Sequence, residues 1–131
     1  MRYLGIDFGT KNIGLALSDE GGAMAFPHSV IHNSKTLVED IVALIKEKSV
    51  DALVVGYSRS HSGADNPIET HTTEFLKKLE KDWSGPVFRE DELYTSREAE
   101  QIQGRNDMID ASAATLILNS YIHRINNQKT S

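Results

Sequence analysis

The chain lacks cysteine, long apolar runs and any excess of basic residues. Without cysteine it has neither a disulfide framework nor thiolate chemistry, which fits a reducing compartment. No apolar run is long enough to cross a bilayer and no basic segment followed by an apolar one opens the sequence, so we expect a cytoplasmic protein that does not enter a membrane. No repeat or low-complexity segment divides the 131 residues, so we expect one domain over residues 1–125 and a polar, flexible tail at residues 126–131.

The charge balance sets a condition on any nucleic-acid function. The 19 acidic residues outnumber the 14 lysines and arginines, which leaves a net charge of -5. Binding of nucleic-acid phosphates normally needs a basic face, so an acidic chain is not the default nucleic-acid binder. Such a function would require a local basic patch or a bound cation in this protein.

The first third of the chain predicts three strands joined as an antiparallel meander. Residues 3–8 form the first strand, and residues 9–12 supply the turn after it. In the second strand, Ile13, Leu15 and Leu17 alternate with small residues, which is the period of a pleated strand. The third strand, residues 23–31, contains Pro27, which places it at a sheet edge or at a bulge.

The hydrophobic pattern then alternates between helix and strand. The first predicted helix is capped by Ser34 and has one apolar face, formed by Leu37, Ile41, Leu44 and Ile45. The strand after it, residues 51–56, is apolar on both faces, as is typical of a central parallel strand.

The second half of the chain continues this alternation. A polar loop at residues 58–67 precedes a second helix, and a strand follows near residues 86–89. A capping box at residues 95–98 predicts a short helix, and a C-terminal helix begins near residue 110. This order predicts an α/β fold: a mixed five-stranded sheet, made of an antiparallel three-strand meander and then parallel strands, with helices on both faces.

Four acidic residues lie where strands end or helices begin. Asp7 ends the first strand, Asp91 and Glu92 follow the fifth, and Asp110 starts the last helix. Ligands of α/β sheets collect beyond the carboxyl ends of the parallel strands, so these carboxylates could converge there. Carboxylate oxygens suit Mg²⁺ or Mn²⁺, and paired metal ions support phosphodiester hydrolysis. The pattern therefore predicts a metal-dependent nuclease.

Each carboxylate also has a structural explanation. Asp110 is of a common helix N-cap type, and residues 90–92 form a charge run of the kind usually found on solvated surface. Asp7 is the hardest to explain in this way, because an unpaired carboxylate within an apolar strand is costly. The nuclease interpretation therefore depends on whether these positions converge.

Other side chains carry weaker signals. The candidate phosphate contacts are Lys11, Arg59, Arg97 and Arg105, although each one taken alone is typical of an ordinary solvated base. Trp83 and Phe88 are expected to pack rather than to stack on bases. His61 could meet a substrate from its loop. The histidines show no metal-binding spacing and are expected at the surface: His28, His32, His61, His71 and His123.

Four segments follow one another along the chain: residues 5–16 (GIDFGTKNIGLA), 54–57 (VVGY), 91–96 (DELYTS) and 109–118 (IDASAATLIL). In this order they resemble the YqgF family, also called RuvX. The resemblance covers nearly the whole chain. It implies an RNase H-like fold and a metal-dependent nuclease, described for the family as a Holliday junction resolvase and as a processor of pre-16S rRNA in ribosome biogenesis. We expect cleavage at the 5' end of that rRNA precursor, with branched DNA as the alternative substrate.

The same resemblance implies roles for individual residues. Asp7, Glu92 and Asp110 would be the catalytic carboxylates that bind Mg²⁺ or Mn²⁺, with Asp91 as the substitute for Glu92. Thr95 would cap the helix that follows the acidic pair. From their positions in the chain we further expect substrate contacts from Gly9, Thr10, Lys11, Arg59, Arg97 and Arg105.

The chain departs from the family pattern at two places. Leu93 stands where the family usually has an arginine after the Asp-Glu pair, and Arg97 lies one helical turn later and could compensate. Tyr57 and Ser58 follow Gly56, where the family usually has Gly-Leu-Pro. These changes bear on substrate preference and leave the three carboxylates in place.

Two other classes of function stay open. The Asp-x-Gly-Thr turn at residues 7–10 also resembles the phosphate loop of actin-like and sugar-kinase ATPases, but those proteins need a second lobe around ATP, for which this chain has no room. A non-catalytic RNA-binding assembly factor, with ribosome assembly intermediates as partners, would explain Leu93 and the weak positive charge. A monomer and a homodimer are both compatible with the sequence.

Overall fold

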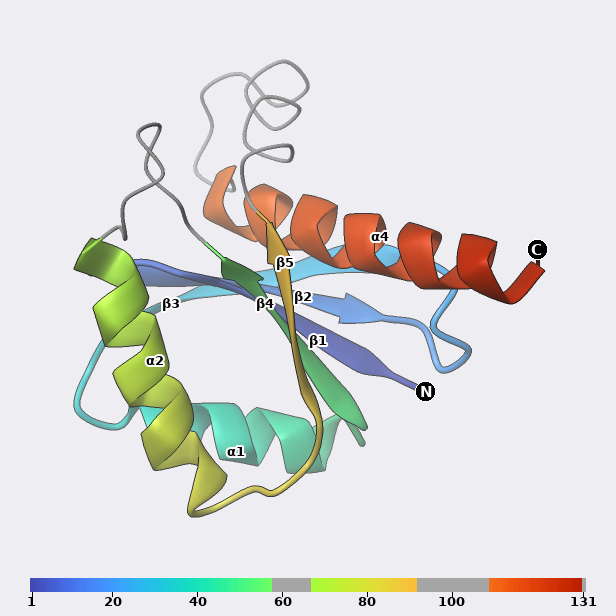
Figure 1. Cartoon of the computed structure of the whole chain (residues 1–131). Helices are drawn as coiled ribbons and strands as arrows, with labels where there is room; N and C mark the ends of the chain where they lie inside the picture. The colour runs from blue at the N-terminus through green and yellow to red at the C-terminus, as the bar shows by residue number, and fades with distance from the viewer. Residues whose placement is uncertain (58–66, 92–108, 131) are drawn as a thin grey trace.

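The protein is described by a computed structural model, which covers residues 1–57, 67–91 and 109–130. Its elements follow one another along the chain as the alternation in the sequence predicts (Figure 1). They are β1 (Tyr3–Phe8), β2 (Asn12–Ser18), β3 (Ala25–His32), α1 (Leu37–Glu47), β4 (Ala52–Tyr57), α2 (Pro67–Glu80), β5 (Val87–Asp91) and α4 (Ile109–Thr130). The short helix expected after residues 95–98 lies outside the described residues.

The five strands form one mixed sheet in the order β3-β2-β1-β4-β5. β1 pairs antiparallel with β2, and β2 pairs antiparallel with β3, which confirms the predicted meander. β4 runs parallel to β1 on one side and to β5 on the other. β3 is an edge strand, and the register shifts between Leu15 and Ala16, opposite Pro27. The proline is thus accommodated at both an edge and a bulge, where its missing N–H costs least.

Helices cover both faces of the sheet, as predicted (Figure 1). α1 and α2 cover one face, and α4 crosses the other. β4 shows why both layers are needed, because Leu53 and Val55 pack toward α1 and α2 while Ala52 and Val54 pack toward α4. All four are fully buried. Such a strand has no polar face and becomes stable only between two layers.

The start of α1 differs from the prediction. The helix begins at Leu37 with Thr36 in the N-cap position, so Ser34 is not its cap. The Ser34 hydroxyl instead accepts a hydrogen bond from the Thr36 N–H at 3.3 Å, two residues further along the chain. A serine that bonds the backbone two residues ahead forms a turn of its own, and this turn precedes the helix here.

The last helix, α4, continues to Thr130, so residues 126–130, which the sequence predicts as a polar tail, have a helical backbone. Within the described part of the chain, no helix, α4 included, is both long enough and apolar enough to cross a membrane.

The contact between β1 and α4 is very close at Gly5. A Cβ built on Gly5 would lie 2.9 Å from the Leu118 Cβ and 3.0 Å from the Ala114 carbonyl oxygen. Neither atom is the end of a flexible side chain, so only glycine fits without displacing the helix. Gly5 therefore sets the distance between α4 and the sheet.

We expect Gly5→Ala to destabilise the protein by about 1–3 kcal/mol, because the added methyl group overpacks this contact. Chemical denaturation followed by circular dichroism measures the loss. Gly21→Ala is the matched control, since a Cβ there would meet only the Asp19 Oδ2 atom, at 3.7 Å. Equal stability of the two variants would show that α4 can move away from β1 without cost.

Candidate active site

The carboxyl ends of the three parallel strands lie side by side. Ile6 pairs with Val55, and Val55 pairs with Arg89 on its other side. One residue further along each strand come Asp7 in β1, Gly56 in β4 and Glu90 in β5. These three strands therefore end at one edge of the sheet, where ligands of parallel sheets gather (Figure 1).

The half-buried Asp7 faces α4 rather than the core beneath α1 and α2. Successive side chains of a strand point to opposite faces, and Leu4 and Ile6 belong to the core beneath α1 and α2. Tyr3 belongs to the core beneath α4, and Asp7 shares that face. The predicted conflict between a carboxylate and its apolar neighbours is thus resolved by the alternation of the strand.

Glycine flanks Asp7 on both neighbouring strands. Gly14 of β2 is its direct partner. Gly56 of β4 lies one residue beyond the Ile6–Val55 pair and completes the row on the other side. Directly adjacent residues of a sheet share a face, so a larger residue at either position would place its side chain beside the carboxylate. The α4 face is therefore clear of strand side chains immediately on both sides of Asp7.

The direction of α4 brings its first turn to the same place. Tyr3 packs against Tyr121 with ring centroids 5.7 Å apart, and Gly5 meets Ala114 and Leu118. Moving along β1 toward Asp7 thus means moving toward the start of α4. Two strand residues rise about 6.6 Å and four helical residues about 6 Å, so the step from Gly5 to Asp7 matches the step from Ala114 to the backbone of Asp110.

The other predicted site residues are placed only in part. Asp91 is the last residue of β5, and its side chain, like that of Asp110, lies outside the described residues. The remaining positions outside the described residues are His61, Glu92, Leu93, Thr95, Arg59, Arg97 and Arg105. Among the residues that the structure describes, no three His, Asp or Glu side chains form a group that could hold a metal ion. Asp7 is the described carboxylate around which such a site could form.

The predicted substrate contacts Gly9, Thr10 and Lys11 form the hairpin between β1 and β2, directly after Asp7. A Cβ on Gly9 would lie 2.4 Å from the Asn12 carbonyl oxygen, so the turn requires glycine. Asn33 fixes the hairpin, because its Nδ2 donates to the Gly9 carbonyl at 3.1 Å and its backbone N–H donates to the Lys11 carbonyl at 2.9 Å. The exposed Thr10 and Lys11 therefore occupy a defined position beside the site.

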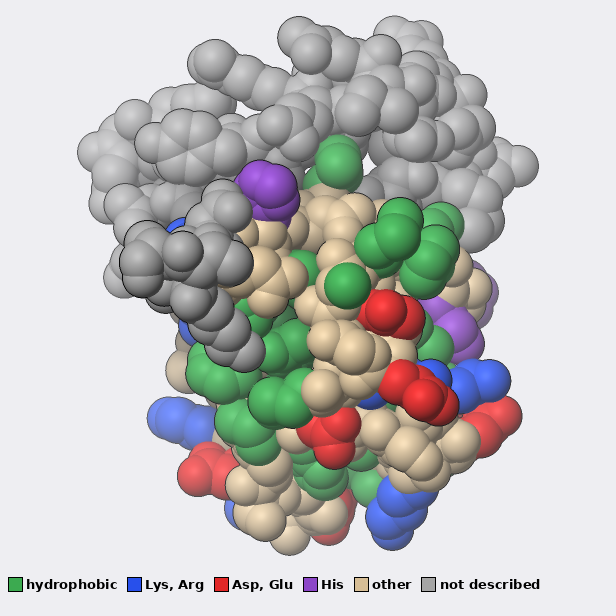
Figure 2. All heavy atoms as spheres, turned by 90° about the vertical axis from the view of Figure 1, so that its right-hand side faces the viewer, with side chains coloured by type: hydrophobic (Ala, Val, Ile, Leu, Met, Phe, Trp, Pro, Cys, Tyr) green, Lys and Arg blue, Asp and Glu red, His purple; other side chains and the backbone are tan. Residues whose placement is uncertain are grey.

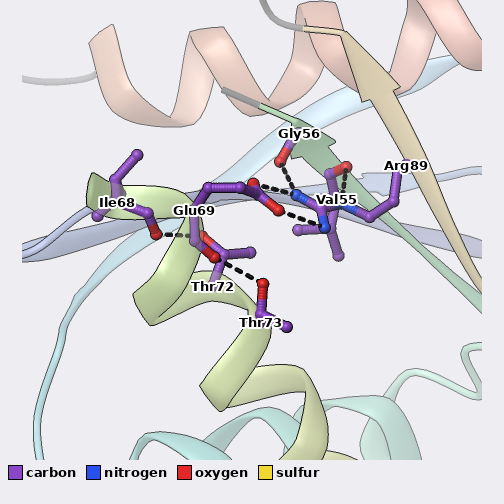
Figure 3. A network of polar contacts seen from close by, with 7 residues as sticks. All are labelled: Val55, Gly56, Ile68, Glu69, Thr72, Thr73 and Arg89. Atoms are coloured by element: carbon purple, nitrogen blue, oxygen red, sulfur yellow. Dashed lines mark hydrogen bonds and ion pairs between the residues drawn. The ribbon is translucent and has the colours of Figure 1, made fainter. Parts of the chain in front are cut away.

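A second feature of this edge is the guanidinium of Arg89, which joins β5, β4 and α2 (Figure 3). Arg89 binds both carboxylate oxygens of Glu69, at 2.6 and 2.9 Å. It also donates to the carbonyl oxygens of Val55 at 3.2 Å and Gly56 at 2.9 Å. The Tyr57 ring lies 5.2 Å from the guanidinium carbon. A bidentate, charge-assisted pair of this kind holds the first turn of α2 against the ends of β4 and β5.

Sequence reasoning missed the Arg89–Glu69 pair. Twenty residues separate the two partners, and each is an ordinary charged residue in its local context. The pair forms because Arg89 lies opposite Val55 in the parallel register, on the face that α2 covers. Only the sheet register and the docking of α2 could have revealed it.

The structure corrects the interpretation of Glu90 as part of a solvated surface. The sequence favours a solvated charge run at residues 90–92, but the Glu90 side chain is only 10% exposed and pairs with Arg124 of α4 at 2.6 Å. Glu90 is thus an ion-pair partner between β5 and α4. Nearby, Phe88 stacks on Tyr121 with centroids 5.2 Å apart, which confirms that it packs. Burial, the largest cause, raises the pKa of the Tyr121 hydroxyl above its usual value.

The surface prediction holds for the described histidines, and the packing prediction holds for Trp83. His28, His32, His71 and His123 are exposed, and Trp83 packs against the core beneath α1 and α2. Figure 2 shows the side of the molecule that includes the N-terminus and the end of α4. Acidic, basic and apolar side chains are mixed there, and the described residues form no continuous basic surface on that side. This side of the molecule therefore does not supply the local basic patch that nucleic-acid binding by a chain of net charge -5 would require.

The comparisons with known sequences agree with one another on the family. A family model described as "RuvX: Holliday junction resolvase" matches residues 1–124. A Nitratidesulfovibrio vulgaris protein named "Putative pre-16S rRNA nuclease" is 34% identical, over 99% of this chain and 99% of its own length. A Bacillus subtilis protein with the same name is 33% identical, over 96% of this chain and 100% of its own.

Solved structures agree in fold. The Thermus thermophilus RuvC structure superposes with a TM-score of 0.61 at 12% identity, covering 96% of this chain and 97% of that chain. The yeast mitochondrial Holliday junction resolvase Ydc2 gives a TM-score of 0.58 at 15% identity, covering 98% of this chain and 80% of that chain. These likenesses in structure confirm the predicted fold class, an RNase H-like fold.

Proposed function

The chain belongs to the RuvX family, and we propose that it is a metal-dependent nuclease that hydrolyses phosphodiester bonds at the 5' end of pre-16S rRNA. The observation that carries this proposal is the position of Asp7. It lies at the carboxyl edge of the parallel strands, faces α4, and has glycine on both neighbouring strands. An acidic side chain so placed lies outside the apolar core, at the edge where ligands of parallel sheets gather.

Asp7, Glu92 and Asp110 would hold Mg²⁺ or Mn²⁺, with Asp91 in place of Glu92 if needed. The donor set fits these ions, because both prefer carboxylate oxygens and water as ligands. Gly14 and Gly56 support this fit, since they keep strand side chains away from the Asp7 carboxylate. When bound, such ions lower the pKa of coordinated water and balance the charge of the reacting phosphate.

The protein's own residues would contribute by positioning the carboxylates and the substrate. The rigid end of β1 would hold the Asp7 carboxylate at the scissile phosphate, and α4 would bring the backbone of Asp110 beside it. Lys11, on the hairpin fixed by Asn33, would meet the substrate backbone. Together with the cations, this would reconcile an acidic protein with an acidic substrate.

The preferred substrate follows from the relatives, which are named for pre-16S rRNA. Branched DNA is the second candidate, because the family model is described as a Holliday junction resolvase and a structural neighbour, Thermus thermophilus RuvC, was solved with a Holliday junction. The fold is compatible with both substrates, so a cleavage assay on each is needed to choose between the rRNA precursor and branched DNA.

We expect the purified protein to cleave a pre-16S rRNA fragment in Mg²⁺ or Mn²⁺ and to lose all cleavage in excess EDTA, with recovery when the metal is restored. Gel assays on the labelled RNA and on a four-way DNA junction measure this and rank the two substrates. Cleavage that persists in EDTA would contradict metal dependence. RNA binding without any cleavage would instead support a non-catalytic assembly factor.

A further inference from the structure

A pocket lies at the same edge of the sheet as Asp7 but on the opposite face from α4. It has a volume of about 190 Å³ and lies between the segment that enters α1, the helix α2 and the end of β1. Two aromatic rings, Phe8 and Phe75, line it with centroids 5.4 Å apart. Phe75 is buried, so its ring provides a fixed wall.

Basic side chains dominate the charge of this pocket. Lys35, His71 and Lys78 line it, and Glu74 is the acidic residue among its described lining. All three basic side chains are exposed, and neither lysine makes an ion pair with a described residue. With His71 neutral, the pocket carries one net positive charge from two lysines and one glutamate. This is a local reversal of the chain's net charge of -5.

Residues that line the pocket are joined by the backbone and by hydrogen bonds to the residues of the proposed active site. Phe8 follows Asp7 directly in β1, and Asn33, another lining residue, donates hydrogen bonds to the Gly9 and Lys11 carbonyls of the hairpin. Asp7 faces α4 while Phe8 faces α2, so a strand of nucleic acid that passes around this edge would meet Asp7 on one face and the lysines on the other.

We propose that this pocket binds a backbone phosphate of the substrate strand near the phosphate that is cleaved. Lys35 and Lys78 would neutralise its charge, and His71 would donate a hydrogen bond. Such a contact carries no sequence information but sets the register of the strand on the protein. The inference rests on the proposed nuclease function, because it assumes that the bound molecule is the nucleic-acid substrate.

The test compares three double variants in a binding assay. Fluorescence anisotropy with the labelled pre-16S rRNA fragment is measured at several salt concentrations, in an Asp7→Asn background so that the RNA stays intact. We expect Lys35→Gln/Lys78→Gln to weaken binding by about three- to tenfold and to reduce the log–log salt slope by about 1 for each lysine. Lys35→Arg/Lys78→Arg should retain most of the affinity, since the charges remain.

The matched control is Lys46→Gln/Lys48→Gln, which removes two charges at the other end of α1. In the cleaving protein, Lys35→Gln/Lys78→Gln should raise KM more than it lowers kcat, whereas a thermal melt should match the control. Equal affinity and equal salt slope in the Lys35/Lys78 and Lys46/Lys48 variants would overturn the pocket proposal, and cleavage by the unmodified protein would leave the nuclease function standing. Failure of the unmodified protein to bind or cleave either nucleic acid would overturn both.

Discussion

Replacing Asp7 with asparagine should reduce metal-dependent cleavage by about 10³-fold or more. Asparagine keeps the size and shape of the side chain but lacks the negative charge that a divalent cation requires. A loss of about 4 kcal/mol in transition-state stabilisation corresponds to this factor, which is within the several kcal/mol that metal-ion catalysis supplies. The rate of RNA cleavage under single-turnover conditions measures the effect.

The fold of the Asp7→Asn variant should survive, because Asp7 lies at a strand end and is half-buried rather than enclosed in either core. Circular dichroism and a thermal melt check this. Asp82→Asn is the control, since Asp82 is exposed in the turn after α2, away from the carboxyl edge. Divalent-dependent cleavage at the unmodified rate in the Asp7→Asn protein would remove Asp7 from the catalytic site.

Replacing Arg89 with methionine should cost about 3–5 kcal/mol of folding stability, because it leaves a buried charge without its partner. The Glu69 side chain is only 11% exposed and binds Arg89 through both oxygens. The carbonyl oxygens of Val55 and Gly56 also lose a donor. Equilibrium unfolding in urea measures the loss, and the slope of the transition shows whether the folded state stays compact.

The double variant Arg89→Met/Glu69→Met separates the penalty of an orphaned charge from the value of the pair. Removing both partners leaves no unpaired charge, so the double variant should be more stable than Arg89→Met alone. A double-mutant cycle with Glu69→Met gives the coupling energy. If Arg89→Met were no less stable than the double variant, the network in Figure 3 would not hold these elements together.

The strands, and which of them are half-buried or fully buried, could be predicted because their signals are local. The alternation of Ile13, Leu15 and Leu17 and the double-sided apolar run at residues 51–56 specify which segments are half-buried or fully buried. The resemblance of the four ordered segments, from residues 5–16 to residues 109–118, added the RNase H-like fold. Ser34 shows the limit of local reasoning, because a serine before a helix can cap it or form its own turn, and the nearby backbone decides which.

The candidate site was predicted at Asp7 and Asp110 because both residues terminate elements, and the ends of elements are visible in the sequence. The convergence of their side chains stays a prediction, which the contact of Gly5 with Ala114 and Leu118 supports because it fixes the direction and distance of α4. Glu90 was interpreted as solvated because a run of charges looks alike whether one member points to water or to Arg124.

The sequence by itself determined the order of the elements, their buried faces and the acidic residue at the end of β1, since periodicity and turn chemistry act over a few residues. Only the tertiary structure decided the ion pairs Arg89–Glu69 and Glu90–Arg124, the glycines on both sides of Asp7, and the basic pocket of Lys35, His71 and Lys78. These contacts join residues far apart in the chain, and they exist because sheet register and helix docking bring those residues together in space.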